Sequence, residues 1–338
     1  MTAVDFPDPD HGFALDGDGP YAGRWVIVTA DGGSTWHVAG LPPLCGASVC
    51  GYLRAASDTH VYLYGAPTPS TPGYAESTDG GRTWTSDSSP VIDLDPGDSE
   101  TAAVRVVTST DRDGHCRRAV RLQEEEPTGA WHDLTGPPMS PGTCPGGLRR
   151  RGNTVLLLVS GPGAHPVVAT SNDGGHTWDE RTLPCPDGDQ PTGVDLSPQR
   201  LVGVLCEGDT DSGTDTTRST LLTRPVGSPT WYGATTRRRN GGPGSLVLLD
   251  PGSALSSGGG PHIYRNAITR DRGNTWDEQA VPWGGTLGAT EVLPWRGSDD
   301  IHVLAQQRLF TSRDRGRTWD EGRRIHVVNA ETFLAAHP

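Results

Sequence analysis

The chain has 338 residues and a formal net charge of −13, because it contains 41 acidic residues, 28 arginines and no lysine. An acidic chain repels nucleic acid and anionic membrane surfaces, and the absence of lysine excludes lysine Schiff-base chemistry. No stretch approaches the run of about 18 apolar residues that a membrane span requires, so we expect no nucleic-acid partner and no membrane insertion.

An eight-residue motif recurs along the chain and reads Ser/Thr-x-Asp-x-Gly-x-Thr-Trp. Five copies occupy residues 29–36, 77–84, 171–178, 269–276 and 312–319. Two further tryptophans, Trp131 and Trp231, fall in the gaps between the copies, which completes a set of seven at nearly constant spacing. A repeat of about 40 to 50 residues is typical of a propeller blade, whose sheet must stack on its neighbours to bury both faces.

Each repeat divides into four short strands with alternating apolar and polar positions. The first repeat predicts strands at residues 3–6, 12–15, 25–29 and 35–38, and the last predicts strands at 289–293, 301–305, 308–312 and 318–321. Only residues 331–336 have a helical composition. The sequence therefore predicts an all-β fold, a single seven-bladed β-propeller of four-stranded blades that forms one domain over residues 1–338. Ring closure is expected to pair the two ends of the chain, through residues 325–329 or 4–6.

The motif is expected where two adjacent strands of a blade reverse. Its Asp can accept hydrogen bonds from nearby backbone amides, and its Gly supplies backbone angles that a side chain would forbid. Its Trp should bury a ring between blades or under the turn, which is worth about 2 to 3 kcal/mol. In the third repeat Glu126 and Thr128 replace the Asp and Gly, and in the fifth Val226 and Ser228 do, so these two turns should be looser.

The motif resembles the Asp box of sialidases and other BNR-type proteins, of sortilin-type receptors and of seven-bladed photosystem II assembly factors. Residues 6–14, Phe-Pro-Asp-Pro-Asp-His-Gly-Phe-Ala, also resemble a blade start of the assembly-factor type. The resemblance spans essentially the whole chain. It implies that the motif lies at the outer edge of each blade, away from the axial funnel where ligands bind. A structural role follows for the motif aspartates Asp31, Asp79, Asp173, Asp271 and Asp314.

Six cysteines, an even number without metal-site spacing, favour disulfides. Of the many connectivities that six cysteines allow, pairing of neighbours along the chain is the simplest, which predicts Cys45–Cys50, Cys116–Cys144 and Cys185–Cys206. Disulfides imply an extracellular or periplasmic protein. Free thiols in a cytoplasmic protein remain the alternative.

Candidate ligand-binding residues come from two arginine runs, residues 149–151 and 237–239, and from one Tyr-Arg pair. Both runs are expected near inner strands, where alternate side chains could converge on an anionic group. The alternative is that they are solvated charges paired with local Asp and Glu. The candidates are Arg149, Arg151, Arg237, Arg239, Tyr264 and Arg265.

A sialidase would hold its substrate carboxylate with three arginines and use a Tyr–Glu pair as the nucleophile. The chain lacks the Phe/Tyr-Arg-Ile-Pro segment of sialidases, and it has seven repeats where they have six. We therefore assign no catalytic residue. Residues 209–215 and 16–19 resemble calcium loops, but neither has the bidentate Glu, because Thr220 stands at the twelfth position of the first. No metal and no cofactor are expected.

These observations lead to two hypotheses from different classes. The first is an exported binding module, expected to be a monomer, that holds a protein or carbohydrate ligand on one propeller face. The second is a sialidase-like glycoside hydrolase or lyase that acts on acidic sugars. A weaker third is an intracellular enzyme that has adopted the scaffold, which free thiols would support.

Overall fold

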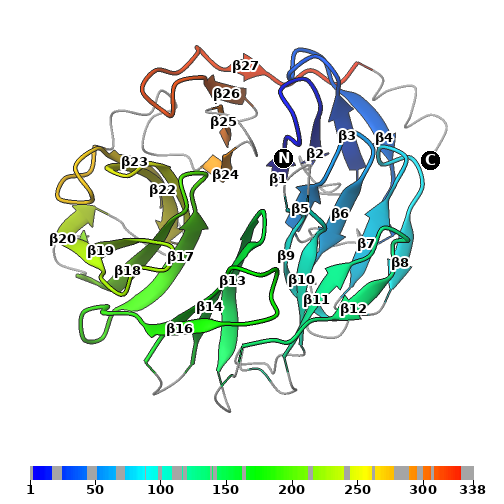
Figure 1. Cartoon of the computed structure of the whole chain (residues 1–338). Coiled ribbons are helices and arrows are strands. Elements are labelled where there is room, and N and C mark those ends of the chain that lie inside the picture. Colours follow the sequence, from blue (N-terminus) through cyan, green and yellow to red (C-terminus); the bar gives the residue numbers. More distant parts are fainter. Residues whose placement is uncertain are drawn as a thin grey trace.

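The computed structural model describes residues 3–16, 25–43, 52–65, 73–87, 89–97, 101–108, 116, 120–137, 139, 143–161, 165–211, 216–239, 244–260, 263–277, 289–294, 300–305 and 308–328. Within these ranges all regular structure is β-strand, arranged as seven antiparallel sheets around a ring (Figure 1). The all-β class and the seven blades predicted from the sequence are confirmed.

The first three blades contain four strands each. Blade 1 consists of β1 (Ala3–Asp5), β2 (Gly12–Asp16), β3 (Trp25–Thr29) and β4 (His37–Gly40). Blade 2 consists of β5 (Tyr52–Ala55), β6 (Val61–Tyr64), β7 (Tyr74–Ser77) and β8 (Thr85–Asp87). Blade 3 consists of β9 (Val91–Asp95), β10 (Val104–Val107), β11 (Arg121–Glu125) and β12 (Trp131–Asp133).

Blades 4 and 5 carry the longest strands. Blade 4 consists of β13 (Cys144–Arg151), β14 (Thr154–Ser160), β15 (Val167–Ser171) and β16 (Asp179–Thr182). Blade 5 consists of β17 (Gln190–Leu196), β18 (Leu201–Asp211), β19 (Thr216–Pro225) and β20 (Tyr232–Arg239).

Blade 6 departs from the four-stranded prediction. Among the described residues it contains β21 (Gly244–Asp250), β22 (Ser253–Gly260) and β23 (Ile263–Thr269), and an isolated bridge between Ile268 and Asp277 stands at the fourth position. Blade 7 consists of β24 (Ala289–Pro294), β25 (Ile301–Ala305), β26 (Arg308–Ser312) and β27 (Arg323–Arg324). The last strand lies beyond the predicted residues 318–321, which belong to the turn, and the predicted helical segment at 331–336 lies outside the described residues.

Seven apolar clusters hold the ring together, one at each junction between neighbouring blades. Each cluster also includes the repeat tryptophan of one blade, packed against the blade before it; these are Trp36, Trp84, Trp131, Trp178, Trp231, Trp276 and Trp319. The indole spacing is therefore the spacing of the junctions, as the sequence predicted. Trp36 is completely buried.

First strands contact one another at six of the junctions, while β9 contacts β6 of blade 2, and together they surround the axis. Three aspartates on these strands link blades in pairs. Asp5, Asp93 and Asp195 accept hydrogen bonds from the backbone amides of the next blade's first strand, at Ala55, Leu148 and Leu248. A buried carboxylate needs such donors, so each of these bonds fixes one blade against the next.

The five complete motifs form one turn, between the third and fourth strands, which we call the repeat turn. In each, the hydroxyl of the first residue donates to the Asp and accepts the Gly amide, while the motif Thr donates its amide and hydroxyl to the Asp. The glycine also packs on the preceding blade: Gly175 has a φ of 101°, and a Cβ there would lie 2.9 Å from Leu134. Both constraints select glycine.

Repeat turns mark one face of the disc, which we call the turn face. The turn amides of Gly80 and Gly174 donate to carbonyls of the hairpin between the first and second strands, at Thr59 and Asn153, so this hairpin lies on the same face. Because the strands are antiparallel, the hairpins between second and third strands and the connections between blades lie on the opposite face, the loop face.

The third and fifth repeats have turns of another type. Their hydrogen bonds run from Gly129 N to Glu126 O and from Ser228 N to Pro225 O, and the Asp-centred network is replaced by single contacts such as Thr128 Oγ1 to Glu126 Oε2 at 3.3 Å. A buried arginine instead lies over each indole: Arg105 is 4.1 Å from the Trp131 ring and Arg224 is 5.0 Å from the Trp231 ring.

The C-terminal part of the described chain closes the ring on blade 1. Trp36 N donates to His326 O, Val328 N donates to Trp36 O, and Trp36 and Val327 form a parallel bridge. Ile325 and Val327 pack on the cluster between blades 7 and 1. Blade 1 already has four strands of its own, so the closing segment adds to its outer edge, and residues 3–5 form the inner strand.

Two of the predicted disulfides are present, Cys116–Cys144 and Cys185–Cys206. The first joins the connection between β10 and β11 to the start of β13, and the second joins the connection between blades 4 and 5 to β18. Cys45 and Cys50 lie outside the described residues. In the described part of the chain there is no helix of the length and apolarity needed to cross a membrane.

Candidate functional site

The buried cluster between blades 2 and 3 differs from the other six because tyrosines form much of it. The other clusters are built largely from Leu, Val, Ile and Ala, whereas this one contains three tyrosines, Tyr62, Tyr64 and Tyr74. We define the polar junction as His60, Tyr62, Tyr74, Glu76, Arg105, Glu125 and Trp131. Charged groups buried between blades cost free energy unless they are paired or bind something, so this junction is the candidate site.

Blade 2 supplies a histidine, two tyrosines and a glutamate. Tyr62 and Glu76 are directly opposite in the β6–β7 register, so both face blade 3. His60 ends the hairpin between β5 and β6 on the turn face. Its amide donates to Ser57 Oγ, its carbonyl accepts from Ala56 N, and its ring lies 4.5 Å from the Tyr62 ring, which together fix its position.

Blade 3 supplies Glu125, Arg105 and Trp131. Glu125 ends β11 and pairs with Trp131 in the register with β12. Arg105 comes from β10, donates its Nε to Gln123 Oε1 at 2.9 Å and places its guanidinium between the rings of Trp131 and Tyr74, 4.1 and 4.7 Å from their centroids. Such stacking is worth about 1 to 2 kcal/mol when desolvated. Burial lowers the pKa of Arg105.

Each carboxylate at the junction is oriented by one tyrosine. Tyr62 donates its hydroxyl to Glu125 Oε2 at 2.6 Å, and Tyr74 donates to Glu76 Oε2. Burial raises the pKa of Glu125, and burial together with the charge of Glu76 raises the pKa of Tyr74 far above its usual value, which keeps the phenol protonated as a donor. One oxygen of each Glu is thus held by a tyrosine.

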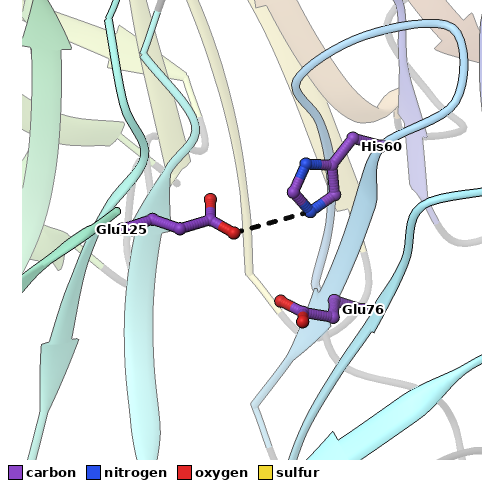
Figure 2. A group of neighbouring side chains, drawn as sticks. All are labelled: His60, Glu76 and Glu125. Carbon is purple, nitrogen blue, oxygen red and sulfur yellow. Dashed lines mark ion pairs between the residues drawn. The ribbon is translucent and has the colours of Figure 1, made fainter. Parts of the chain in front are cut away.

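The two carboxylates and the imidazole ring of His60 point toward one another (Figure 2). Atoms of His60, Glu76 and Glu125 suitable as metal ligands all lie within 4.8 Å of one another, and His60 Nε2 is 3.8 Å from Glu125 Oε1. His60 Nε2 is buried and has no hydrogen-bond partner among the described residues. One imidazole and two carboxylates form a donor set that suits a divalent cation.

The sequence analysis missed this site, and part of the signal was present. Glu125 lies inside the third motif copy, where Glu-Glu-Pro-Thr replaces the usual x-Asp-x-Gly, so the loss of the motif coincides with the polar junction. His60 and Glu76 belong to a different repeat and have no sequence spacing that would identify a site. Only the packing of blade 2 on blade 3 brings the three together.

The first arginine run lies in an inner strand, as predicted, and its side chains alternate. Arg149 Nε is 3.8 Å from Asp195 Oδ1, and Arg151 donates to Leu196 O, both in blade 5. Arg150 faces the other way and donates to Glu124 Oε1 at 2.6 Å in blade 3. Burial raises the pKa of Asp195, and the charges of Arg149 and Arg151 oppose that effect. Arg149 and Arg151 therefore connect blade 4 to blade 5, and Arg150 connects blade 4 to blade 3.

The placement predicted for the second run is wrong. Arg237, Arg238 and Arg239 end β20, the fourth and outermost strand of blade 5, and do not open an inner strand. First and fourth strands of an antiparallel blade run in opposite directions, so the ends of β13 and β20 point to opposite faces of the disc. The two runs therefore do not converge on one ligand.

Tyr264 and Arg265 lie in β23, the third strand of blade 6, where they pair with Gly259 and Gly258. They are therefore not on an inner strand, and their side chains lie outside the described residues. The two calcium-like loops also fall largely outside the described residues, at 212–215 and 17–19.

Comparison with known proteins supports the fold alone. No protein-family model and no curated protein matches the chain. Among solved structures, YCF48 from Cyanidioschyzon merolae is similar with a TM-score of 0.51 and 15% identity, covering 80% of this chain and 84% of that one. A protein from Lactobacillus plantarum reaches 0.56 at 14% identity, covering 90% and 93%. The Dos1 propeller reaches 0.54 at 10% identity, covering 90% and 78%.

Proposed function

We propose that the chain is an exported binding propeller that holds an anionic protein or glycan ligand at the loop face of blade 5. The observation that carries this proposal is the hairpin β18–β19, the longest in the described chain, which reaches the loop face and pairs there with the arginine-rich end of β20. Arg218 and Arg237 are directly opposite in the β19–β20 register, and both are exposed. Arg239 is two residues further along β20.

The base of this hairpin is held rigid. Cys206 in β18 is joined to Cys185, and Arg218 binds the buried Asp189 through Nε, with Nε to Oδ1 at 3.0 Å. A pinned hairpin loses little conformational entropy on binding, which favours affinity. On a chain of charge −13, a local group of arginines also selects an anionic ligand. Of the six residues proposed from the sequence, Arg237 and Arg239 are the ones we retain.

Two further assignments accompany this proposal. The disulfides favour an oxidising compartment outside the cytoplasm. The hydrogen-bond pattern of the repeat turns, centred on one Asp and repeated five times, supports the assignment of these turns as Asp boxes.

The sialidase-like alternative receives less support from the described residues. Two Tyr–Glu pairs of the nucleophile type exist, Tyr62–Glu125 and Tyr74–Glu76, but both tyrosines are buried between blades, with 1% and 3% of their surface exposed. A substrate sugar cannot reach either hydroxyl without separating the two blades.

A binding assay with charge-reversed variants tests the proposal. The purified chain is applied to an array of neutral and acidic glycans and titrated with a poly-glutamate peptide, and a panel of chromogenic glycosides is assayed in parallel. Arg237→Glu with Arg239→Glu should lower binding of the acidic probes at least tenfold. Arg82→Glu with Arg317→Glu, the same charge change at exposed positions of the turn face, should leave it unchanged.

Equal loss in both double variants would show a general charge effect and contradict the proposal, as would the absence of binding to any acidic probe. Turnover of a chromogenic glycoside would instead support the hydrolase alternative.

A further inference from the structure

We propose that His60, Glu76 and Glu125 form a binding site for one divalent transition-metal ion of the zinc type, which joins blade 2 to blade 3. His60 comes from the hairpin between β5 and β6 of blade 2, Glu76 comes from β7 of the same blade, and Glu125 comes from β11 of blade 3 (Figure 2). This site is independent of the loop-face binding proposed above, because it lies on the turn-face side of another junction.

The donor atoms fit this ion class. Zinc accepts imidazole nitrogen and carboxylate oxygen at about 2.0 to 2.2 Å, which places neighbouring ligand atoms about 3.3 to 3.5 Å apart in a tetrahedral site. The three groups lie within 4.8 Å of one another, so they need to move together by about an ångström, which rotation of the two Glu side chains can supply. A solvent molecule would complete the coordination. Calcium prefers six to eight oxygen ligands, so the imidazole disfavours it.

Neighbouring side chains and a backbone turn fix the positions of the three donor groups. Metal-binding carboxylates are usually fixed by hydrogen bonds to their second oxygen, and here Tyr62 binds Glu125 Oε2 while Tyr74 binds Glu76 Oε2. The His60 ring lies 4.5 Å from the Tyr62 ring at a tilt of 41°, and its backbone is fixed by the Ser57–His60 turn. Donors that are already ordered lose little entropy when a metal binds.

An observation independent of the acidic pair also points to a bound cation. His60 Nε2 is buried and has no hydrogen-bond partner among the described residues, although its side chain as a whole is 23% exposed. A buried nitrogen without a partner costs free energy, and a metal ion at the centre of the group would satisfy it. The exposed edge of the ring gives an ion access from the turn face.

The surrounding charges support the same conclusion. Glu76 and Glu125 are close enough to repel each other, and each raises the electrostatic cost of the other. Among the described residues, Arg105 stacks on Trp131 and Tyr74, donates to Gln123 and pairs with Asp87 at 3.5 Å, and no ion pair joins it to either Glu. A divalent cation would neutralise both carboxylates. The third repeat lacks the Asp-centred turn, so the metal would also strengthen a junction that has lost this network.

The chain provides a matched control at His132. This histidine also lies between two glutamates, but Glu124 approaches its Nε2 and Glu126 its Nδ1, at 3.6 and 3.8 Å. The two carboxylates approach different ring nitrogens, and among the described residues these three groups do not gather as closely as His60, Glu76 and Glu125 do, so we expect no metal site there.

The experiment is a zinc titration of chelator-treated protein. Isothermal titration calorimetry and metal analysis after gel filtration should give one Zn²⁺ per wild-type chain, with Ca²⁺ bound far more weakly. His60→Gln and Glu76→Gln should weaken Zn²⁺ binding at least tenfold, and His132→Gln should not. As a second readout, Zn²⁺ should raise the thermal unfolding midpoint of the wild type and His132→Gln but not of His60→Gln.

Circular dichroism of the metal-free variants shows whether they are folded. If His60→Gln does not fold, Glu76→Gln is the variant compared with the wild type. The proposal is overturned if the wild type binds no Zn²⁺ in stoichiometric amount, or if His60→Gln and Glu76→Gln both bind it as the wild type does. Loss of binding only in His132→Gln would place the metal elsewhere and would also overturn it.

Discussion

A single aspartate organises each complete repeat turn. Asp79 accepts hydrogen bonds from the hydroxyl and amide of Thr83, at 2.6 and 2.8 Å, from the hydroxyl of Ser77 and from the amide of Arg82. The Thr83 hydroxyl and amide lower the pKa of Asp79 to about 2, against 3.8 for the free group. The carboxylate therefore favours the folded state most when it is ionised.

Asp79→Asn should reduce the free energy of unfolding by about 1 to 2 kcal/mol at pH 7, because an amide offers one acceptor oxygen where the carboxylate uses two. Since the folded pKa is below the unfolded one, this stabilisation is present above about pH 4 and is lost as the pH falls toward 2. Urea unfolding of the wild type and of Asp79→Asn at several pH values measures this difference in the free energy of unfolding. Glu126→Gln, at the same motif position of the third repeat, should change stability by less than about 0.5 kcal/mol. A difference that persists unchanged at pH 3 would contradict the argument.

At the scale of strands and hairpins, the antiparallel order of each blade decides which groups share a face. It places the two arginine runs at opposite faces, and it places His60 beside the repeat turns. The same order puts the two described disulfides where connections between blades meet long hairpins. Cys185–Cys206 closes a 21-residue separation and ties the start of blade 5 to β18, whose Cys206 is completely buried.

Cys185→Ala with Cys206→Ala should lower the free energy of unfolding by about 3 kcal/mol, chiefly because the unlinked chain gains freedom when unfolded. Chemical denaturation under non-reducing conditions measures this loss. The double variant should also respond less to added reductant than the wild type does, since one of its bridges is already absent. An unfolding midpoint equal to that of the wild type would show that the bridge does not constrain blade 5.

At the scale of the whole molecule, closure of the ring depends on a few residues. The seven clusters form a cycle only if blade 7 packs on blade 1, and residues 325–328 cover that junction with two backbone hydrogen bonds to Trp36 and two partly buried aliphatic side chains. Every blade depends on two neighbours, so loss of one junction weakens the whole ring.

Removal of residues 325–338 should cost about 2 to 4 kcal/mol relative to removal of residues 329–338 alone, from two hydrogen bonds and the burial of Ile325 and Val327. Comparison of the two truncations isolates the closing segment. Calorimetry should show one cooperative transition in the longer form if residues 1–338 act as one domain, and a lower, broader one in the shorter form. Equal midpoints for the two truncations would mean that the ring closes without this segment.

Much of the architecture follows from local patterns. Trp36 and its six counterparts locate the junctions because a large ring at the end of a turn has one place to be buried, between its own blade and the one before. The strands at 25–29, 301–305 and 308–312 match the predicted residues because apolar alternation is a local property. The last strand of blade 7 does not match, because residues 318–321 continue the turn and only Arg323 and Arg324 pair with β26.

The functional sites could not be predicted from local sequence patterns. The two triple-arginine runs predicted a shared clamp for an anionic ligand. In the structure Arg149 lies 3.8 Å from Asp195, and Arg237 lies in the outermost strand of blade 5. His60, Glu76 and Glu125 carry no common motif. Chain distance says little about which side chains meet across a junction between blades.

The order of residues alone was sufficient to predict seven repeats, the all-β class, the turn chemistry and two cysteine pairs, because each depends on contacts within a repeat or between adjacent ones. The polar junction, the opposite faces of the two arginine runs and the segment that closes the ring became evident only in three dimensions. They depend on how blades pack face to face and on strand direction, and these are properties of the assembled ring that no single repeat encodes.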